Sequence, residues 1–455
     1  MEQSGSTAAV KTQFHLFTQR RFLPFFVTQF LGALNDNLFK NALLVIVVST
    51  AVAGSESNTN FITNLAAGLF ILPYFLFSTT AGQLADRYDK SMLIRRIKFA
   101  EIVLMVLGCA ALWLGDVFWM LAILFALGVQ SAFFGPIKYS IIPQHLGSDE
   151  LLAGNAQVGM GTFVSILLGT LLGGWLVTAD QGPIYVGALA IGFALIGWLS
   201  SRQIPTAPSV STDSGSKLGL NPFPVTAQNY RLARENPLVF YCIQGISWFW
   251  LFGGAFLTQV PNFAIVVLSG HPTLISVLLA AFIVGVAMGA LLCHRFSSGN
   301  VEPGLVPLGG LGLSVFAIDL FFTSLAYQAG NPLRETVMPM QFLTMGSGVH
   351  ILFDLIFIGM FGGFLIVPLY SMIQERTSGD RRARVISINN IFNALYMVAG
   401  ALLGIVFLSV LGWTIPQFFL AIALLNILML GVIFYFAPEF ILRFKAWIGQ
   451  LLPRS

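Results

Sequence analysis

The sequence predicts an all-α membrane protein with twelve transmembrane helices. Of its 455 residues, 56% are hydrophobic and only 9% are charged, whereas a soluble domain carries about 25% charged residues. The mean hydropathy is +0.82. The apolar residues form runs of roughly 20 residues, the length that a helix needs to cross a ~30 Å hydrocarbon layer. This composition excludes a soluble enzyme.

The apolar runs fall into two groups of six, separated by a polar stretch rich in Pro and Ser. The first six predicted spans are 22–51, 61–84, 97–114, 117–134, 154–177 and 185–199. The second six are 238–264, 275–293, 305–326, 351–373, 387–411 and 415–436. We therefore expect two six-helix bundles, over residues 22–199 and 238–436. A cytoplasmic linker (200–237) joins them, and an N-terminal segment (1–21) and a tail (437–455) flank them.

The basic residues predict that both termini are cytoplasmic. All Lys and Arg residues except Lys40 and Arg334 lie in the N-terminal segment, in or within two residues of the connections that follow even-numbered spans, or in the tail. Short loops rich in Lys and Arg stay in the cytoplasm. The pI near 9.0 reflects this bias and does not indicate nucleic-acid binding. The first span is too long for a signal peptide, so we expect no cleavage.

The tail has apolar residues at helical spacing with basic residues between them, which predicts an amphipathic helix on the cytoplasmic surface. The apolar residues are Phe440, Ile441, Phe444, Trp447, Ile448 and Leu451.

Motifs of catalysis, ATP binding and metal binding are not found in the sequence. The three cysteines, Cys109, Cys242 and Cys293, lie in or at the ends of apolar runs and are expected to pack. The five histidines are scattered. His145 and Asp149 are similar to an acyltransferase pair, but their spacing is one residue short. We expect no enzyme activity, cofactor or metal, and transport that is passive or coupled to an ion gradient.

The two halves of the sequence resemble each other. Phe134-Gly-Pro-Ile-Lys-Tyr-Ser-Ile-Ile-Pro-Gln leads into a helix that carries Gly169-Thr-Leu-Leu-Gly173, and Val367-Pro-Leu-Tyr-Ser-Met-Ile-Gln leads into one that carries Gly400-Ala-Leu-Leu-Gly404. Small residues four apart let helices pack closely in lipid, and Gly285 and Gly289 repeat the pattern. A six-span unit used twice is typical of an alternating-access transporter, with its site near the midplane between the halves.

One motif resembles the signature of the major facilitator superfamily. Gly82-Gln-Leu-Ala-Asp-Arg-Tyr-Asp-Lys90, between the second and third spans, is similar to G-x-L-a-D-R-x-G-R-[RK], with Asp89 in place of the second glycine. The resemblance implies the twelve-helix fold of that superfamily.

Three further segments resemble the bacterial lysophospholipid transporter family. They are Gln29-Phe-Leu-Gly-Ala-Leu-Asn-Asp-Asn-Leu38, Phe134-Gly-Pro-Ile-Lys-Tyr139 and Pro368-Leu-Tyr-Ser-Met-Ile-Gln-Glu-Arg376. The resemblance covers residues 28–436. It implies a flippase that moves lysophospholipids, such as lysophosphatidylethanolamine, from the outer to the inner leaflet of the inner membrane. A fused or recruited acyltransferase/acyl-ACP synthetase would re-acylate them there.

Two other functions remain open at this stage: a proton-coupled carrier of a small solute or drug, and a membrane anchor for an acyltransferase. The composition favours an amphiphile, because the spans offer few polar side chains and the chain holds 42 phenylalanines. A lipid tail must stay in lipid or in an apolar groove, so only the headgroup needs polar residues. One acid for an ammonium and one or two lysines for a phosphate suffice, which matches Asp36, Lys40 and Lys138.

The first span supplies most of the candidate substrate-binding residues. Asp36 lies close to its midpoint, and Lys40 follows one turn later on the same face, so the two can form an ion pair. A charged side chain at bilayer depth costs ~2.5–3.5 kcal/mol, so it pairs, faces a cavity or serves function. Asn35 and Asn37 flank Asp36, and three consecutive polar residues cannot all face one partner. We expect all four residues to bind substrate, with a purely structural ion pair as the alternative.

Lys138 and Gln259 complete the candidate binding set. Lys138 lies near the cytoplasmic end of the fourth span, between Pro136 and Pro143, which distort the helix end and can aim the lysine inward. Alternatively, its ammonium extends to the membrane interface. Gln259 is one of the few polar residues of the seventh span, which carries no charge.

The family signature and the corresponding loop of the second half contain the candidate gating residues. They are Gly82, Asp86, Arg87, Asp89, Lys90, Arg376 and Arg382. The superfamily resemblance implies that the first loop latches neighbouring helices on the cytoplasmic side. A solvated charged turn and direct substrate contact are the alternatives, and cytoplasmic retention alone could explain the positive second loop.

Three other acids lie within the spans. Glu101 is expected one turn inside the third span, where it pairs with a basic neighbour. The basic residues within its reach are Arg95, Arg96 and Lys98. Asp319, deep in the ninth span, and Asp354, near the outer end of the tenth, are expected to form interhelical hydrogen bonds or a second polar anchor.

Overall fold

A computed structural model of the chain describes residues 13–51, 56–210, 219, 221–297, 301–331 and 336–451. Over these residues the protein is helical, with one isolated β-bridge between Gly270 and Val337. In this described part, twelve helices are long and apolar enough to cross a membrane, which confirms the predicted number of spans. Arg334 lies outside the described residues.

The first six of these helices are α1 (Leu23–Ala51), α2 (Glu56–Arg87), α3 (Lys90–Leu114), α4 (Val117–His145), α5 (Leu151–Leu176) and α6 (Gly182–Ser201). The second six are α8 (Pro237–Asn262), α9 (Thr273–Phe296), α10 (Leu305–Gly330), α12 (Gly346–Arg376), α13 (Arg382–Gly404) and α14 (Ile415–Phe436). Two of them continue into π-helices, α8 into η2 (Phe263–Val267) and α13 into η3 (Ile405–Val410).

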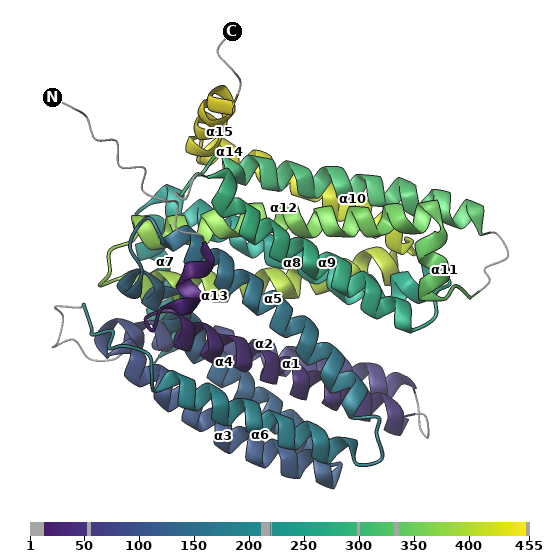
Figure 1. The fold of residues 1–455 in the computed structure, drawn as a ribbon, viewed down its shortest axis with the longest axis horizontal. Helices are drawn as coiled ribbons and strands as arrows, with labels where there is room; N and C mark the ends of the chain where they lie inside the picture. Colours follow the sequence, from purple (N-terminus) through teal and green to yellow (C-terminus); the bar gives the residue numbers. More distant parts are fainter. Residues whose placement is uncertain are drawn as a thin grey trace.

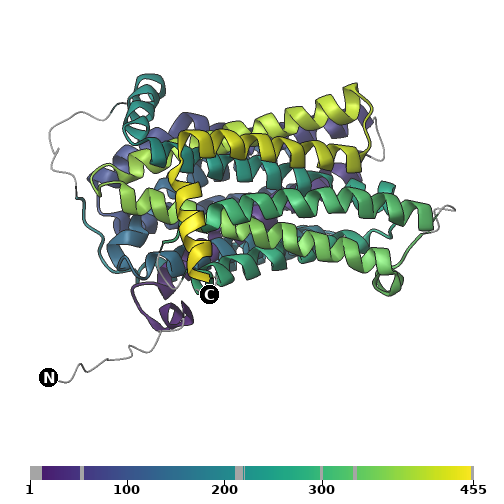
Figure 2. The ribbon, with the colours of Figure 1, turned by 90° about the horizontal axis from the view of Figure 1, so that it is seen from above.

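The short helices lie in the connections and in the two terminal segments. They are η1 (Gln13–Thr18), α7 (Pro222–Arg234), α11 (Pro339–Thr344) and α15 (Glu439–Leu451). The helix predicted in the tail is present as α15. It runs across the direction of the long helices (Figure 2), with Phe440 buried and Trp447 donating to the Phe296 carbonyl oxygen at 3.1 Å.

Two long helices extend well beyond the spans that hydropathy predicts. α3 begins at Lys90 and not at residue 97, because Asp89 caps its first turn by accepting from the Met92 amide at 2.7 Å. α4 continues to His145 through both Pro136 and Pro143 and does not end at residue 134. Neighbouring helices can compensate for the hydrogen bonds that a proline removes, so prolines are tolerated inside membrane helices.

The long helices form two groups that meet at one end (Figure 1). α1–α6 make the first half and α8–α14 the second half. Across the boundary α2 packs against α13 and α5 against α9. The halves converge at the end of the molecule that carries Gln13 and Leu451, and we call this the terminal end. They diverge toward the other end of the long helices, which we call the opposite end.

Glycines allow the closest helix pairs, as their spacing predicts. A Cβ atom at Gly169 on α5 would lie 2.5 Å from the Leu34 carbonyl oxygen of α1, and one at Gly173 would overlap the next turn of α1. Gly285 and Gly289 on α9 meet the backbone of α12 in the same way. In the remaining pair only one glycine lies close to another helix. A Cβ at Gly400 would lie 3.2 Å from the Leu251 side chain of α8, whereas one at Gly404 would make an ordinary 3.9 Å contact.

Candidate functional site

Asp36 lies in the middle of α1 with one carboxylate oxygen unpaired. The residue is 9% exposed. Its Oδ2 accepts from the Ser131 hydroxyl of α4 at 2.5 Å, whereas Oδ1 is buried and has no hydrogen-bond partner among the described residues. A buried carboxylate with a free acceptor can bind a cationic group without first losing a protein partner.

Asn35, unlike the adjacent Asp36, has its side-chain donors paired within the protein. Its amide donates to Glu101 Oε1 of α3 at 3.1 Å and to the Ala190 carbonyl oxygen of α6 at 3.0 Å. The residue is fully buried. Both donors of Asn35 are therefore occupied in joining three helices, so this geometry does not support the predicted contact with substrate.

Glu101 is the centre of a buried polar network. It forms an ion pair with Lys98 and also accepts from Gln130 Nε2 at 2.8 Å. The side chains of Lys98 and Glu101 are 1% and 0% exposed. The predicted pairing with Lys98 is confirmed, but the predicted depth is wrong. Because α3 begins at Lys90, Glu101 lies about three turns inside the helix.

The Asp36–Lys40 ion pair that the sequence allows is not formed. Among the described ion pairs, none joins these two residues. Lys40 Nζ instead donates to Asn37 Oδ1 at 3.0 Å and lies 5.9 Å from the centre of the Phe70 ring. Asn37 Nδ2 donates to the Ala33 carbonyl oxygen of its own helix at 2.8 Å.

Lys138 is directed into the protein and not toward the membrane interface. It is 9% exposed, and its Nζ donates to the Thr162 hydroxyl of α5 at 2.7 Å. The ammonium also lies 5.3 Å from the centre of the Tyr139 ring. Within the described chain no carboxylate forms an ion pair with it. A buried ammonium without a counter-ion is able to bind an anion.

Gln29 connects the neighbourhood of Lys138 to α1. Its Oε1 accepts from the Thr162 hydroxyl at 3.2 Å, and its Nε2 is buried with no described hydrogen-bond partner. Gln29 and Asp36 are seven residues apart, which places them on one face of α1 about 10 Å apart along the helix axis. An unpaired donor near a lysine and an unpaired carboxylate oxygen therefore share one helix face.

Gln259 does not join this group. It lies near the opposite end of α8, where its Oε1 accepts from Asn262 Nδ2 at 3.2 Å. The second half instead offers Trp250, whose ring stacks on Phe163 of α5 at 5.7 Å and whose Nε1 has no described partner. The sequence pattern predicted no role for this tryptophan.

Asp86 joins the two halves at the terminal end. Its carboxylate is 3% exposed. Oδ1 accepts from the Ala383 amide at 3.1 Å, and Oδ2 accepts from the Arg384 amide at 3.2 Å and from its Nε at 3.4 Å. Gly82, one turn earlier, permits this approach, because a Cβ there would lie 2.8 Å from the Ala383 carbonyl oxygen.

Four other candidate gating residues do not bridge the halves through any described hydrogen bond or ion pair: Asp89, Lys90, Arg376 and Arg382. Asp89 caps α3, and its Oδ2 accepts from the Ala207 amide at 2.9 Å. Arg376 pairs with Glu439 of α15 at 3.2 Å, and Arg382 donates to the Thr377 carbonyl oxygen at 3.0 Å. Arg87 ends α2, and Lys90, which is buried, begins α3. The basic partner of Asp86 is thus Arg384.

A second contact between the halves was missed by sequence reasoning. Asn155 of α5 and Gln374 of α12 exchange amide hydrogen bonds of 2.6 and 3.0 Å. Gln374 Nε2 also donates to the Tyr139 carbonyl oxygen at 3.0 Å. The Tyr139 and Tyr370 rings stack with centroids 3.9 Å apart. Both tyrosines occupy the same place in the two similar segments, which was the available signal.

Comparisons with known proteins place this fold and sequence among transporters. The model of the Major Facilitator Superfamily matches residues 25–349. The lysophospholipid transporter LplT of Photorhabdus laumondii is 27% identical over 360 residues, 77% of this chain and 78% of the relative. The human organic anion transporter MFSD10 superposes with a TM-score of 0.69 at 15% identity, over 91% of this chain and 99% of its own. The Escherichia coli fucose:proton symporter superposes with a TM-score of 0.64 at 14% identity, over 92% and 99%.

The Glu101 network predicts a specific pattern of stability. Glu101→Gln leaves Lys98 buried without a counter-ion, so we expect a loss of about 3–5 kcal/mol in unfolding free energy. Adding Lys98→Met removes the stranded charge and should recover part of that loss. Thermal unfolding of the purified protein in detergent measures both, with Asp180→Asn, at an exposed acid, as the control. A double variant less stable than Glu101→Gln alone would contradict the network.

Proposed function

This chain belongs to the major facilitator superfamily, and we propose that it is a lysophospholipid transporter. In this proposal it moves lysophospholipids such as lysophosphatidylethanolamine from the outer to the inner leaflet of the bacterial inner membrane. Relatives that carry the name lysophospholipid transporter match over about three quarters of the chain. The match also covers 78–81% of these relatives, which supports a shared activity.

The unpaired charges of the first half are the observation that carries the proposal. Lys138 has no counter-ion among the described residues, and Asp36 has a free carboxylate oxygen. A zwitterionic phosphoethanolamine headgroup supplies both missing partners, with its phosphate at Lys138 and the Gln29 amide and its ammonium at Asp36. The ~10 Å between Gln29 and Asp36 along α1 is comparable to an extended phosphoethanolamine group with a hydrogen bond at each end.

The acyl chain sets a second requirement. Each methylene that leaves an apolar environment costs about 0.8 kcal/mol, so the chain stays in lipid or against apolar side chains while the headgroup crosses. The described hydrogen bonds of Asn35, Asn37 and Lys40 are all made to other protein groups. We therefore assign them to positioning the α1 face, and we leave direct headgroup contact to Asp36, Lys138 and Gln29.

The transport cycle follows from the closed terminal end. We take this end as cytoplasmic, because it carries nearly all the basic residues. The present conformation then faces outward, with Asp86–α13, Asn155–Gln374 and Tyr139–Tyr370 holding it shut. A lysolipid enters sideways from the outer leaflet, and these contacts separate as the halves rock. A cytoplasmic acyltransferase then consumes the product.

The headgroup assignment predicts a difference between two substrates. Lys138→Met removes a charge-assisted hydrogen bond worth about 1.5–3 kcal/mol, so it should weaken binding of any lysophospholipid by roughly 10- to 150-fold. Asp36→Asn should weaken binding of lysophosphatidylethanolamine strongly but binding of lysophosphatidylglycerol little, because the glycerol headgroup has no ammonium. Competition for labelled lysolipid uptake in proteoliposomes measures both. Lys445→Met, in the exposed part of the tail helix, is the control.

An equal loss of affinity for the two lipids in Asp36→Asn would contradict an ammonium site at that residue. Unchanged uptake of both lipids in Lys138→Met would contradict the phosphate site.

Chain length separates a lysolipid transporter from a small-solute carrier. Shortening the acyl chain from sixteen to eight carbons should weaken competition progressively, by up to about 0.8 kcal/mol per methylene. Glycerophosphoethanolamine, which has no chain, should barely compete. If the chainless compound competes as well as the lysolipid, the protein is a solute carrier. If neither is transported by the folded protein, the anchor function is favoured.

The closed end predicts a gating phenotype. Asp86→Ala removes three hydrogen bonds to α13 but touches no predicted headgroup contact, so maximal uptake should fall while the substrate concentration for half-maximal uptake changes little. Asp89→Ala is the control, because Asp89 bonds only within the first half and its connection in the described hydrogen bonds. It should lower thermal stability without this kinetic pattern. A tenfold loss of affinity in Asp86→Ala at unchanged maximal rate would place Asp86 in the binding site.

A further inference from the structure

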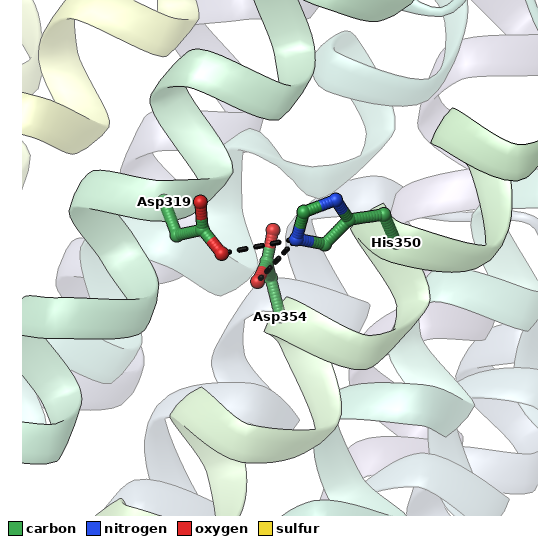
Figure 3. Close-up of side chains that lie close together, drawn as sticks. All are labelled: Asp319, His350 and Asp354. Atoms are coloured by element: carbon green, nitrogen blue, oxygen red, sulfur yellow. Dashed lines mark hydrogen bonds and ion pairs between the residues drawn. The ribbon is translucent and has the colours of Figure 1, made fainter.

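Three side chains that can bind a metal ion meet between α10 and α12, away from the contacts of the two halves (Figure 3). His350 Nε2 lies 3.0 Å from Asp319 Oδ2 and 3.8 Å from Asp354 Oδ1. One ligand atom from each residue falls within 4.8 Å of the others. The interhelical hydrogen bond predicted for Asp319 is formed, whereas the one predicted for Asp354 is not among the described contacts.

Asp354 is the residue that points to a ligand. Its side chain is 0% exposed, and neither carboxylate oxygen has a hydrogen-bond partner among the described residues. Figure 3 shows this carboxylate directed toward Asp319 and His350. A fully buried ionised carboxylate without hydrogen bonds is costly, and either a proton or a bound cation relieves that cost.

The described surroundings do not supply enough positive charge. A cavity of about 300 Å³ opens beside the cluster, and no Lys or Arg is among the described residues that line it. They are Asp319, Phe322, Thr323, Ala326, Gly346, Ser347 and His350. Two carboxylates and one imidazole leave a net negative charge even when the histidine is protonated. The side chains of His350 and Asp319 are 48% and 43% exposed, so a small ion has access to them.

We propose that Asp319, His350 and Asp354 form a binding site for a divalent transition-metal ion. Imidazole together with carboxylates suits Zn²⁺ and its neighbours in the first row better than Mg²⁺ or Ca²⁺. His350 and Asp354 are one helical turn apart on α12, a spacing that directs both toward one ion, and α10 supplies the third ligand. Bond lengths of about 2.0–2.2 Å to Zn²⁺ place tetrahedral ligand atoms about 3.4 Å apart. The 3.0 Å between His350 and Asp319 must therefore lengthen slightly, and the 3.8 Å between His350 and Asp354 must shorten. The half-exposed Asp319 and His350 side chains can rotate to do so, and water from the cavity completes the coordination.

The sequence predicts interhelical hydrogen bonds or a polar anchor at Asp319 and Asp354 but not their meeting with His350, because the three residues come from two helices separated by the 331–345 connection. The site lies within the second half and shares no residue with Asp36, Lys138 or Gln29. It therefore does not depend on the proposed lysolipid transport, and a bound ion would join α10 to α12.

Zn²⁺ binding to the purified full-length protein tests the proposal. After chelator treatment, Zn²⁺ is titrated against a chromophoric chelator, and one equivalent should bind. His350→Ala and Asp354→Asn should each weaken this binding at least tenfold, as should Asp319→Asn at a half-exposed position where folding is not at risk. The matched controls, His271→Ala and Asp180→Asn, replace a histidine and an exposed acid outside the cluster and should leave the affinity unchanged. Zn²⁺ should also raise the thermal unfolding temperature of the parent but not of the cluster variants.

Two results would overturn the proposal. One is stoichiometric Zn²⁺ binding that all three cluster variants retain at full affinity, which would place the ion elsewhere. The other is no binding by the folded parent at millimolar Zn²⁺, in which case the cluster is only a histidine–carboxylate ion pair.

Discussion

The buried ion pair between Lys98 and Glu101 is the interaction on which the arrangement of the first half depends. A charge at bilayer depth must find its partners inside the protein, because lipid offers none. Glu101 forms an ion pair with Lys98 of its own helix and accepts hydrogen bonds from Asn35 of α1 and Gln130 of α4. These contacts fix the rotation of α1, and with it the direction of Asp36. Two neighbours in one polar run thus have different tasks, one structural and one open to a ligand.

The contacts that close the terminal end differ in kind from the buried Lys98–Glu101 ion pair. Asp86 is bound mostly by backbone amides, and Asn155 and Gln374 form a neutral pair. The Asn155–Gln374 bonds are neutral, and the arginine that pairs with Asp86 is 26% exposed, so water can replace these contacts when the end opens. Separating Lys98 from Glu101 instead leaves two buried charges. The strong interaction therefore lies within a half and the weaker ones lie between the halves, which are the contacts that break in the proposed transport cycle.

The sequence predicted what depends on composition and local pattern. Twelve apolar runs predicted twelve helices, and helical spacing predicted α15 and the Lys98–Glu101 pair. It failed where tertiary packing overrides local rules. The sequence predicted that the fourth span ends at residue 134, just before Pro136, but α4 continues through this proline. The partner of Asp36 is Ser131 and not Lys40, and Asn155 meets Gln374 across 219 positions of sequence. No spacing rule predicts such contacts, since the relative rotation of two helices decides them.

The proposed headgroup site and the closed end are adjacent in sequence, which suits a physical route from substrate binding to movement of the halves. Lys138, the proposed phosphate ligand, directly precedes Tyr139, whose ring stacks on Tyr370 and whose carbonyl oxygen accepts from Gln374. Without substrate the Lys138 ammonium lies near the Tyr139 ring, an attraction worth about 0.5–2 kcal/mol. A phosphate that draws the ammonium toward Gln29 weakens that attraction and so loosens Tyr139 at the contact between the halves. Substrate binding in the first half can thereby favour opening of the terminal end without any charged residue from the second half at the site.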